Sequence, residues 1–152
     1  MIIRPARNED AEDACLVLRR SIIELCVADQ GNDAKILAGW LANKTPEHVR
    51  TWIGNPDNVV VVAEEDGAIL GVGAVARSGE ITLNYVSPDA RFRGVSKAML
   101  ARLEVQASAF GQTLCVLTST STARRLYEAA GYRADATVKR TGIGTRMRKD
   151  LP

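Results

Sequence analysis

The stretch ITLNYVSPDARFRGVSKAML, residues 81–100, joins an alternating apolar segment to a basic turn and then to the start of a helix. The alternation over Ile81–Val86 predicts a half-buried strand, and Val95 and Met99 begin a helical apolar spacing. The first N–H groups of a helix have no partner within it, and the helix dipole adds positive partial charge there. Gly94 lets this backbone approach a ligand closely. The stretch therefore predicts a phosphate site.

Composition and charge limit the class of protein. The chain has 152 residues, 46% hydrophobic and 25% charged, which predicts one soluble domain over residues 1–152. A formal net charge of +2 is too small to favour nucleic acid or an anionic membrane as partner. Cys15, Cys26 and Cys115 have no CxxC spacing, so we expect reduced core thiols in a cytoplasmic protein. The sequence shows no secretion signal and no apolar run of membrane-spanning length.

Hydrophobic periodicity predicts alternating helices and strands. We expect helices from the Asn8 cap to about residue 25, over Ile36–Asn43, from the Thr45 cap onwards, from Gly94 to Phe110, and over Ser121–Ala130. We expect strands over Ile2–Arg4, Val59–Glu64, Ala68–Arg77, Glu80–Val86, Leu114–Thr118, Tyr132–Lys139 and Gly144–Lys149. The three strands from Val59 form an antiparallel meander, whereas a crossover helix places Leu114–Thr118 parallel to the strand that ends at Val86.

Three segments carry a resemblance to a known family. They are Ile3-Arg4-Pro5-Ala6 before an acidic helix start, Val86-Ser87-Pro88 followed by Arg91-Phe92-Arg93-Gly94-Val95-Ser96, and Ala123–Tyr132. In this order and spacing the chain resembles the GNAT superfamily of acyl-CoA-dependent N-acetyltransferases. The resemblance implies an α/β (α+β) fold: a mixed, mostly antiparallel sheet of about six to seven strands, flanked by about four to five helices, with two splayed parallel central strands.

The resemblance also implies acetyl-CoA, or coenzyme A, as cofactor. Pantetheine is similar to a peptide and would fill the gap between the splayed strands, while the turn around Gly94 would bind the pyrophosphate. The cofactor-binding residues implied are Tyr85, Val86, Arg91, Phe92, Arg93, Gly94, Val95, Ser96, Lys97, Thr120, Arg124 and Tyr127. Ser96 stands where the family usually has Gly or Ala, and Thr120 where it often has Asn, which reaches further.

Tyr127 matches the tyrosine that family members often direct at the coenzyme A sulfur. A phenol with a pKa of about 10 is protonated at neutral pH and can donate a proton to the departing thiolate. The resemblance therefore implies a catalytic role. The alternative is a core tyrosine on the apolar face of its helix.

The sequence says less about the residues on the acceptor side, which would bind the amine and take its proton. An amine must lose a proton before it attacks, yet the strand Ile81–Val86 holds no acid. Glu24, Asp29 and Asp33 are candidates near the substrate cleft, with a solvated surface role as the alternative. Asn84 and Tyr85 alternate on the strand, and the one that faces the cleft could bind substrate or a relay water.

The two tryptophans and the single histidine are expected to have structural roles before functional ones. Trp40 and Trp52 are core or lid anchors, or walls of an apolar pocket, and His48 is a surface residue. One histidine and three dispersed cysteines make no metal shell, and no nucleotide-binding glycine motif is present.

The sequence thus predicts an enzyme that transfers acetyl from acetyl-CoA to a primary amine of a small molecule or peptide, by direct attack in a ternary complex. The alternative is a non-catalytic acyl-CoA sensor or interaction module of the same fold. Neither nucleic acid nor a membrane is expected as a partner. The sequence allows a homodimer but does not decide the oligomeric state.

Overall fold

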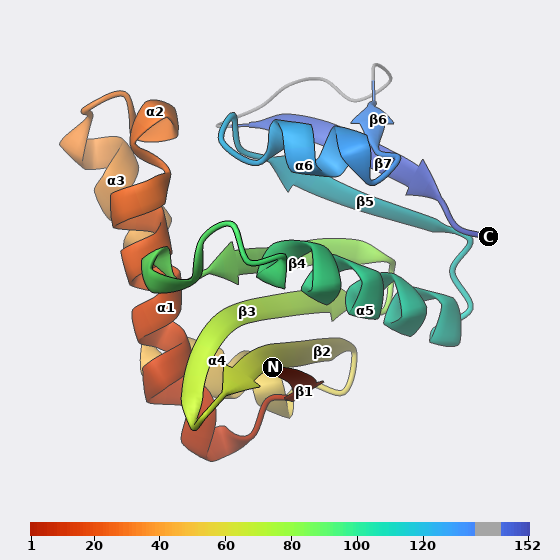
Figure 1. Ribbon diagram of the computed structural model, residues 1–152, viewed down its shortest axis with the longest axis horizontal. Helices are drawn as coiled ribbons and strands as arrows, with labels where there is room; N and C mark the ends of the chain where they lie inside the picture. Colours follow the sequence, from red (N-terminus) through yellow and green to blue (C-terminus); the bar gives the residue numbers. More distant parts are fainter. Residues whose placement is uncertain (136–143) are drawn as a thin grey trace.

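The computed structural model describes residues 1–135 and 144–152. One sheet runs through this part of the chain in the order β1-β2-β3-β4-β5-β7-β6 (Figure 1). Its strands are β1 (Ile2–Pro5), β2 (Asn58–Glu65), β3 (Ala68–Ala76), β4 (Glu80–Val86), β5 (Leu114–Ser119), β6 (Arg133–Ala134) and β7 (Thr145–Asp150). The helices are α1 (Ala11–Leu25), α2 (Val27–Gln30), α3 (Ala34–Leu41), α4 (Pro46–Gly54), α5 (Val95–Ala109) and α6 (Arg124–Ala129), with 3-10 turns η1 (Asn8–Asp10) and η2 (Pro88–Ala90).

The sheet is mixed, and its one parallel contact in the described chain is short. β1 to β4 pair as antiparallel neighbours, and so do β5, β7 and β6. β4 and β5 pair in parallel only through Glu80 with Val116 and Ile81 with Leu117. Beyond Ile81 the two strands separate. This confirms the expected mixed, mostly antiparallel sheet with two splayed parallel strands.

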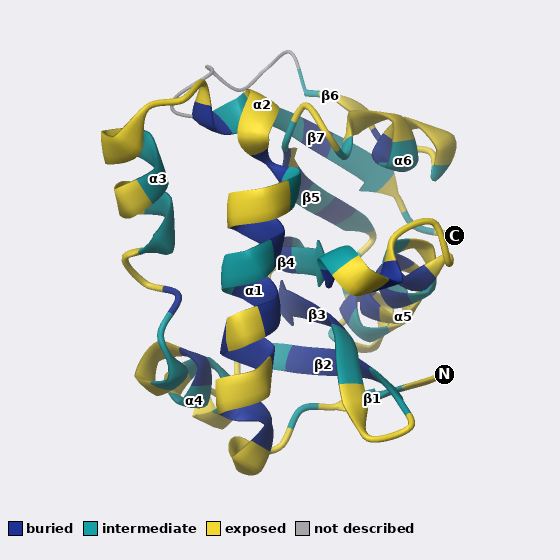
Figure 2. Ribbon diagram, turned by 60° about the vertical axis from the view of Figure 1, so that its left-hand side comes forward, coloured by how far each residue is buried: buried dark blue, intermediate teal, exposed yellow. Residues whose placement is uncertain are grey.

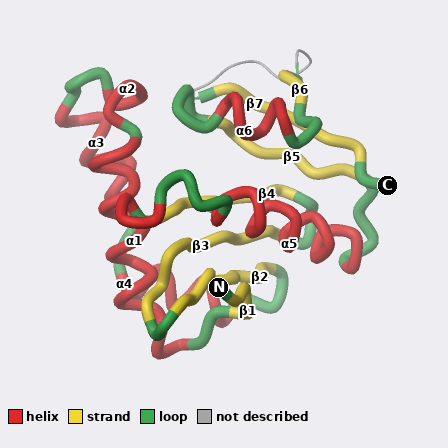
Figure 3. Tube along the Cα trace, viewed as in Figure 1, coloured by secondary structure: helices red, strands yellow, loops and turns green. Residues whose placement is uncertain are grey.

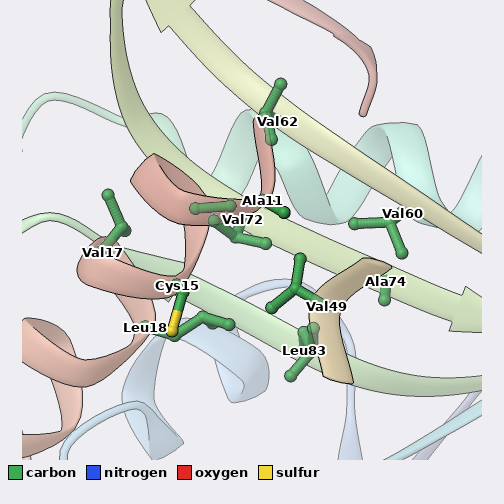
Figure 4. Packing of buried hydrophobic residues seen from close by; sticks show 11 residues of the cluster. Ala11, Cys15, Val17, Leu18, Val49, Val60, Val62, Val72, Ala74 and Leu83 are labelled. Carbon is green, nitrogen blue, oxygen red and sulfur yellow. The ribbon is translucent and has the colours of Figure 1, made fainter. Parts of the chain in front are cut away.

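Helices cover both faces of the sheet because its strands are apolar on both sides. On β2, Val60 and Val62 pack toward α1 and α4, where Leu18 and Val49 are fully buried (Figure 4). Figure 2 shows the buried side of α1 turned to the strands. The strand period of two then directs the intervening Val61 to the opposite face.

The second face is covered by α5 and α6 (Figure 1). Leu103 of α5 packs with Val75 and Ile81, while Tyr127 of α6 packs with Leu117 and Met147 in the same core. This core reaches from one half of the sheet into the other, on the side where β4 and β5 still pair. It therefore fixes the closed end of the gap between the two strands.

Several helix boundaries differ from the sequence expectation. Asn8 does not cap α1; Asp10 accepts the Arg7 N–H at 2.7 Å and pairs with Arg4, so a 3-10 turn precedes the helix. The last helix begins at Arg124 instead of residue 121, because the Thr120 hydroxyl accepts the Ala123 N–H and holds residues 121–123 in a turn (Figure 3).

The strands expected at the end of the chain are confirmed only in part. The final pair of strands is present, but β6 has two residues, and β7 lies between it and β5. Residues 136–139 of the expected strand Tyr132–Lys139 lie outside the described residues. The short α2 was not expected from the sequence. Cys15, Cys26 and Cys115 are free thiols in the core, as expected. Among the described residues, every helix is too short or too polar to span a bilayer.

Candidate active site

A cleft of about 140 Å³ opens where β4 and β5 separate. Its walls come from both strands, from the end of α1 with Cys26, and from α6 with Tyr127. Within the described residues, the backbone groups of β4 that face the gap have no partner strand beyond Ile81. Unpaired backbone groups inside a sheet are costly unless a ligand or water satisfies them. Burial raises the pKa of Cys26 to about 11, so this thiol is protonated at neutral pH and is no nucleophile.

Tyr127 and Asn84 form the polar pair of this cleft. Tyr127 is 6% exposed, and its hydroxyl accepts a hydrogen bond from Asn84 Nδ2 at 3.3 Å. Burial raises the pKa of Tyr127, which keeps the phenol protonated at neutral pH. Since Asn84 is the donor in this bond, the phenol proton is available to another acceptor. Asn84 Oδ1 is buried and has no hydrogen-bond partner among the described residues, so this part of the cleft offers a free acceptor beside a free donor.

Tyr85 connects β4 to α3. Its hydroxyl accepts a hydrogen bond from Trp40 Nε1 at 3.2 Å, and burial raises the pKa of Tyr85 to about 12. Trp40 thus anchors α3 over the cleft, and Trp52 packs against the same α1/α4-side core as Tyr85. His48 is exposed and hydrogen-bonded to Thr45, as expected for a surface residue.

The turn between β4 and α5 exposes a run of unpaired backbone donors. Among the described residues, no acceptor is present for any N–H from Arg91 through Lys97. Phe92 and Gly94 both have left-handed backbones, with φ of 62° and 76°, and Phe92 is 93% exposed. A left-handed non-glycine residue is strained, and such strain is concentrated at functional sites. With the 15-residue α5 behind it, the turn fits a diphosphate.

The side chains around the turn are not equally free to meet an anion. Arg93 lies 2.6 Å from Glu65, so that carboxylate already neutralises its charge. Arg124 pairs with Glu128 at 3.3 Å, and the Val95 side chain is buried in the core. Arg91 lies over the Phe92 ring, 4.7 Å from its centroid. For Val95, only the backbone N–H faces the anion site.

The three carboxylates suggested by the sequence already have ion-pair or hydrogen-bond partners. Glu24 pairs with Arg20 at 2.9 Å, Asp29 accepts the Ser121 N–H at 2.7 Å, and Asp33 caps α3. None of the three lines either cavity, although Asp29 also accepts a hydrogen bond at 3.3 Å from the hydroxyl of Thr122, a residue of the cleft wall. Asn84, Tyr85 and Thr120, by contrast, all line the cleft.

Sequence reasoning missed a second cavity, of about 520 Å³, on the α3 side of the same strands. Four residues line both this cavity and the first cleft, so the two adjoin: Thr82, Tyr85, Thr118 and Thr120. Its other walls include Lys35 and Lys44. Lys44 lies between two helices, where no periodicity marks it as buried, yet it is only 8% exposed. No cluster of metal-ligating side chains occurs within residues 1–135 and 144–152.

Known structures share this architecture over nearly the whole chain. A GCN5-related N-acetyltransferase from Rhodopseudomonas palustris superposes with a TM-score of 0.85 at 22% identity, covering 99% of this chain and 95% of the other. PaiA N-acetyltransferase from Thermoplasma acidophilum, solved with coenzyme A, gives a TM-score of 0.84 at 21% identity, with 99% and 98% covered. YncA from Salmonella typhimurium, a putative acetyltransferase solved with acetyl-CoA, gives 0.69 at 22%, with 100% and 94% covered.

At these identities the superpositions establish the fold. No curated protein matches the chain in sequence. The family model of the acetyltransferase (GNAT) domain matches residues 27–151, which contain β2 to β7, the turn around Gly94 and Tyr127. The chain therefore belongs to the GNAT family of acetyl-CoA-dependent acyltransferases.

Proposed function

We propose that this protein transfers the acetyl group of acetyl-CoA to a primary amine of a small molecule or peptide, by direct attack in a ternary complex. The observation that carries the proposal is the separation of β4 from β5, with the Tyr127 hydroxyl on one wall of the gap. The family match supports acetyl transfer, and relatives of the same fold were solved with coenzyme A or acetyl-CoA.

The binding residues follow from the unpaired groups. The N–H groups from Arg91 through Lys97 would hold the diphosphate, and Lys97 and Arg91 would add positive charge beside it. The free edge of β4 at Tyr85 and Val86 would hydrogen-bond the pantetheine amides as a neighbouring strand does. Thr120 lines the same gap and can donate through its hydroxyl.

Tyr127 would act at the sulfur. When bound, acetyl-CoA supplies an activated acetyl thioester, whose sulfur leaves as a thiolate when the amine nitrogen bonds to the carbonyl carbon. The Tyr127 O–H is protonated by burial and is not engaged as a donor within the described residues, so it can hydrogen-bond or protonate that sulfur.

The acceptor amine would meet Asn84. Its buried Oδ1 lacks a partner in the described part of the chain and can accept a hydrogen bond from the amine N–H or from a relay water. Neither cavity is lined by a carboxylate or histidine from the described residues. The amine proton would therefore leave through water rather than to a neighbouring acid.

The absent carboxylate also favours a second candidate, an acyl-CoA sensor without turnover. Release of free thiol from acetyl-CoA across a panel of amines and peptides, beside thermal shift with coenzyme A, separates the two. Thiol release with any amine supports transfer. A higher melting temperature with coenzyme A, without thiol release in the presence of any amine, supports the sensor.

A further inference from the structure

The cavity beneath α3 is built from positive charge and apolar surface. Lys35 and Lys44 line it beside Ile36, Gly39 and Trp40, and no acidic side chain of the described chain does so. Its floor is formed by β4 and β5, and β4 also carries Asn84 and Tyr85 into the first cleft. A molecule in this cavity would thus have one end beside the acyl group.

Lys44 is the unusual member of this lining. It is 8% exposed, and its ammonium contacts Asn43 Oδ1 at 2.6 Å and the Trp40 carbonyl at 3.4 Å. An ammonium has three donors, so one remains without a partner among residues 1–135 and 144–152. No carboxylate of the described residues pairs with Lys44, although most other buried or half-buried cations in the same part have one.

Burying an unpaired charge is costly. Burial lowers the pKa of Lys44, because the buried ammonium loses hydration and has no carboxylate partner among the described residues. Lys35, at the start of α3, adds a second cation without an ion pair in the described chain. Two cations and no acid favour an anion and disfavour a second ammonium, because a like charge would be repelled.

We propose that the cavity beneath α3 selects acceptor amines that also carry a carboxylate on an apolar body, with Lys44 as the carboxylate partner. This inference rests on the proposed function, since it names the acceptor class of the same site. Lys44 would donate to the carboxylate through its free N–H, and Trp40 and Ile36 would contact the apolar body. Polyamines and other polycations would be poor acceptors.

The test compares three amines with the same ring: phenylalanine, phenylalaninamide and 2-phenylethylamine. We expect kcat/KM to be higher for phenylalanine by about tenfold or more, the range of a charge-assisted hydrogen bond. Lys44→Met should bring the three values together, Lys44→Arg should restore much of the preference, and Lys35→Met should lower it. Arg50→Met removes a surface cation that lies outside both cavities and should change nothing.

Equal kcat/KM values for the three amines in the wild type would overturn the inference while leaving acetyl transfer intact. So would a Lys44→Met variant that slows all three amines equally. If Lys44→Met does not fold, two results still test the inference. They are the preference of the wild-type protein for phenylalanine and the reduction of that preference in Lys35→Met.

A binding experiment makes the test independent of turnover. Calorimetry would compare N-acetylphenylalanine with its amide on the wild-type protein and on Lys44→Met, each with coenzyme A present. Tighter binding of the carboxylate, lost in the variant, supports the inference even if no amine is acetylated. Equal affinity for the two compounds overturns it.

Discussion

Replacing Tyr127 by phenylalanine removes one oxygen atom from the wall of the cleft and keeps the ring. We expect kcat to fall by roughly tenfold to a thousandfold, because a proton donor to the leaving sulfur is lost, with little change in coenzyme A affinity. The folding cost is small. The bond lost is a neutral one of 3.3 Å from Asn84, worth about 1 kcal/mol, which lowers the melting temperature by roughly 2–4 °C.

Tyr132 provides a matched control. It is buried beside Tyr127, with ring centroids 5.8 Å apart, but its hydroxyl donates to Glu104 at 2.9 Å and lines neither cavity. Hydrogen bonds to a charged group are worth about 1.5–3 kcal/mol, so Tyr132→Phe should lower the melting temperature by roughly 3–12 °C. Its kcat should stay near the wild-type value.

The two variants therefore have opposite expected profiles. Steady-state thiol release and differential scanning calorimetry on both proteins measure them. If Tyr127→Phe keeps the wild-type kcat, or if the two variants lose activity equally, then Tyr127 is a core residue and the leaving-group assignment is wrong.

Three further outcomes are expected from other parts of the molecule. Gly94→Glu should abolish coenzyme A binding in calorimetry at a folding cost of about 1 kcal/mol from its left-handed backbone, whereas Gly111→Glu, at the other end of α5, should bind normally. Retained affinity in the first would refute the diphosphate turn. Gly79→Ala should lower the melting temperature more than Gly111→Ala, because only at Gly79 does the new Cβ lie 2.5 Å from the Leu114 carbonyl oxygen; equal shifts would contradict this. Asp10→Asn should reduce stability mainly above pH 3.8, since Arg4 lowers the pKa of Asp10 below that ordinary value, so the carboxylate's contribution is present above it and lost as the pH falls through the lowered pKa. A difference in melting temperature that is independent of pH would show that the pair is not responsible.

The fold could be predicted from the sequence because its determinants are local. Alternating apolar residues on the strand around Tyr85, turn residues such as Gly67, and a crossover helix restrict the topology to very few arrangements. The glycine turn was predictable for the same reason. Its residues are contiguous, and backbone donors at a helix start depend on little beyond the chain's local path.

The acceptor side could not be predicted to the same extent, because it is made by contacts between distant segments. The pairing of Asp29 with Ser121 and of Arg93 with Glu65 joins residues far apart in the chain. Such pairing decides which charges are free, and no spacing reveals it. Lys44 was missed for this reason, since its burial depends on α3 and α4 folding around it.

The short ladder between β4 and β5 couples ligand occupancy to folding. Since only two residue pairs bridge the halves of the sheet there, a ligand that hydrogen-bonds both would serve as the missing rungs. Its binding free energy would add to the free energy of unfolding by RT ln(1 + [L]/Kd), about 2.7 kcal/mol at one hundred times Kd. The thermal tolerance of this enzyme would then track the local supply of the molecule that fills the gap.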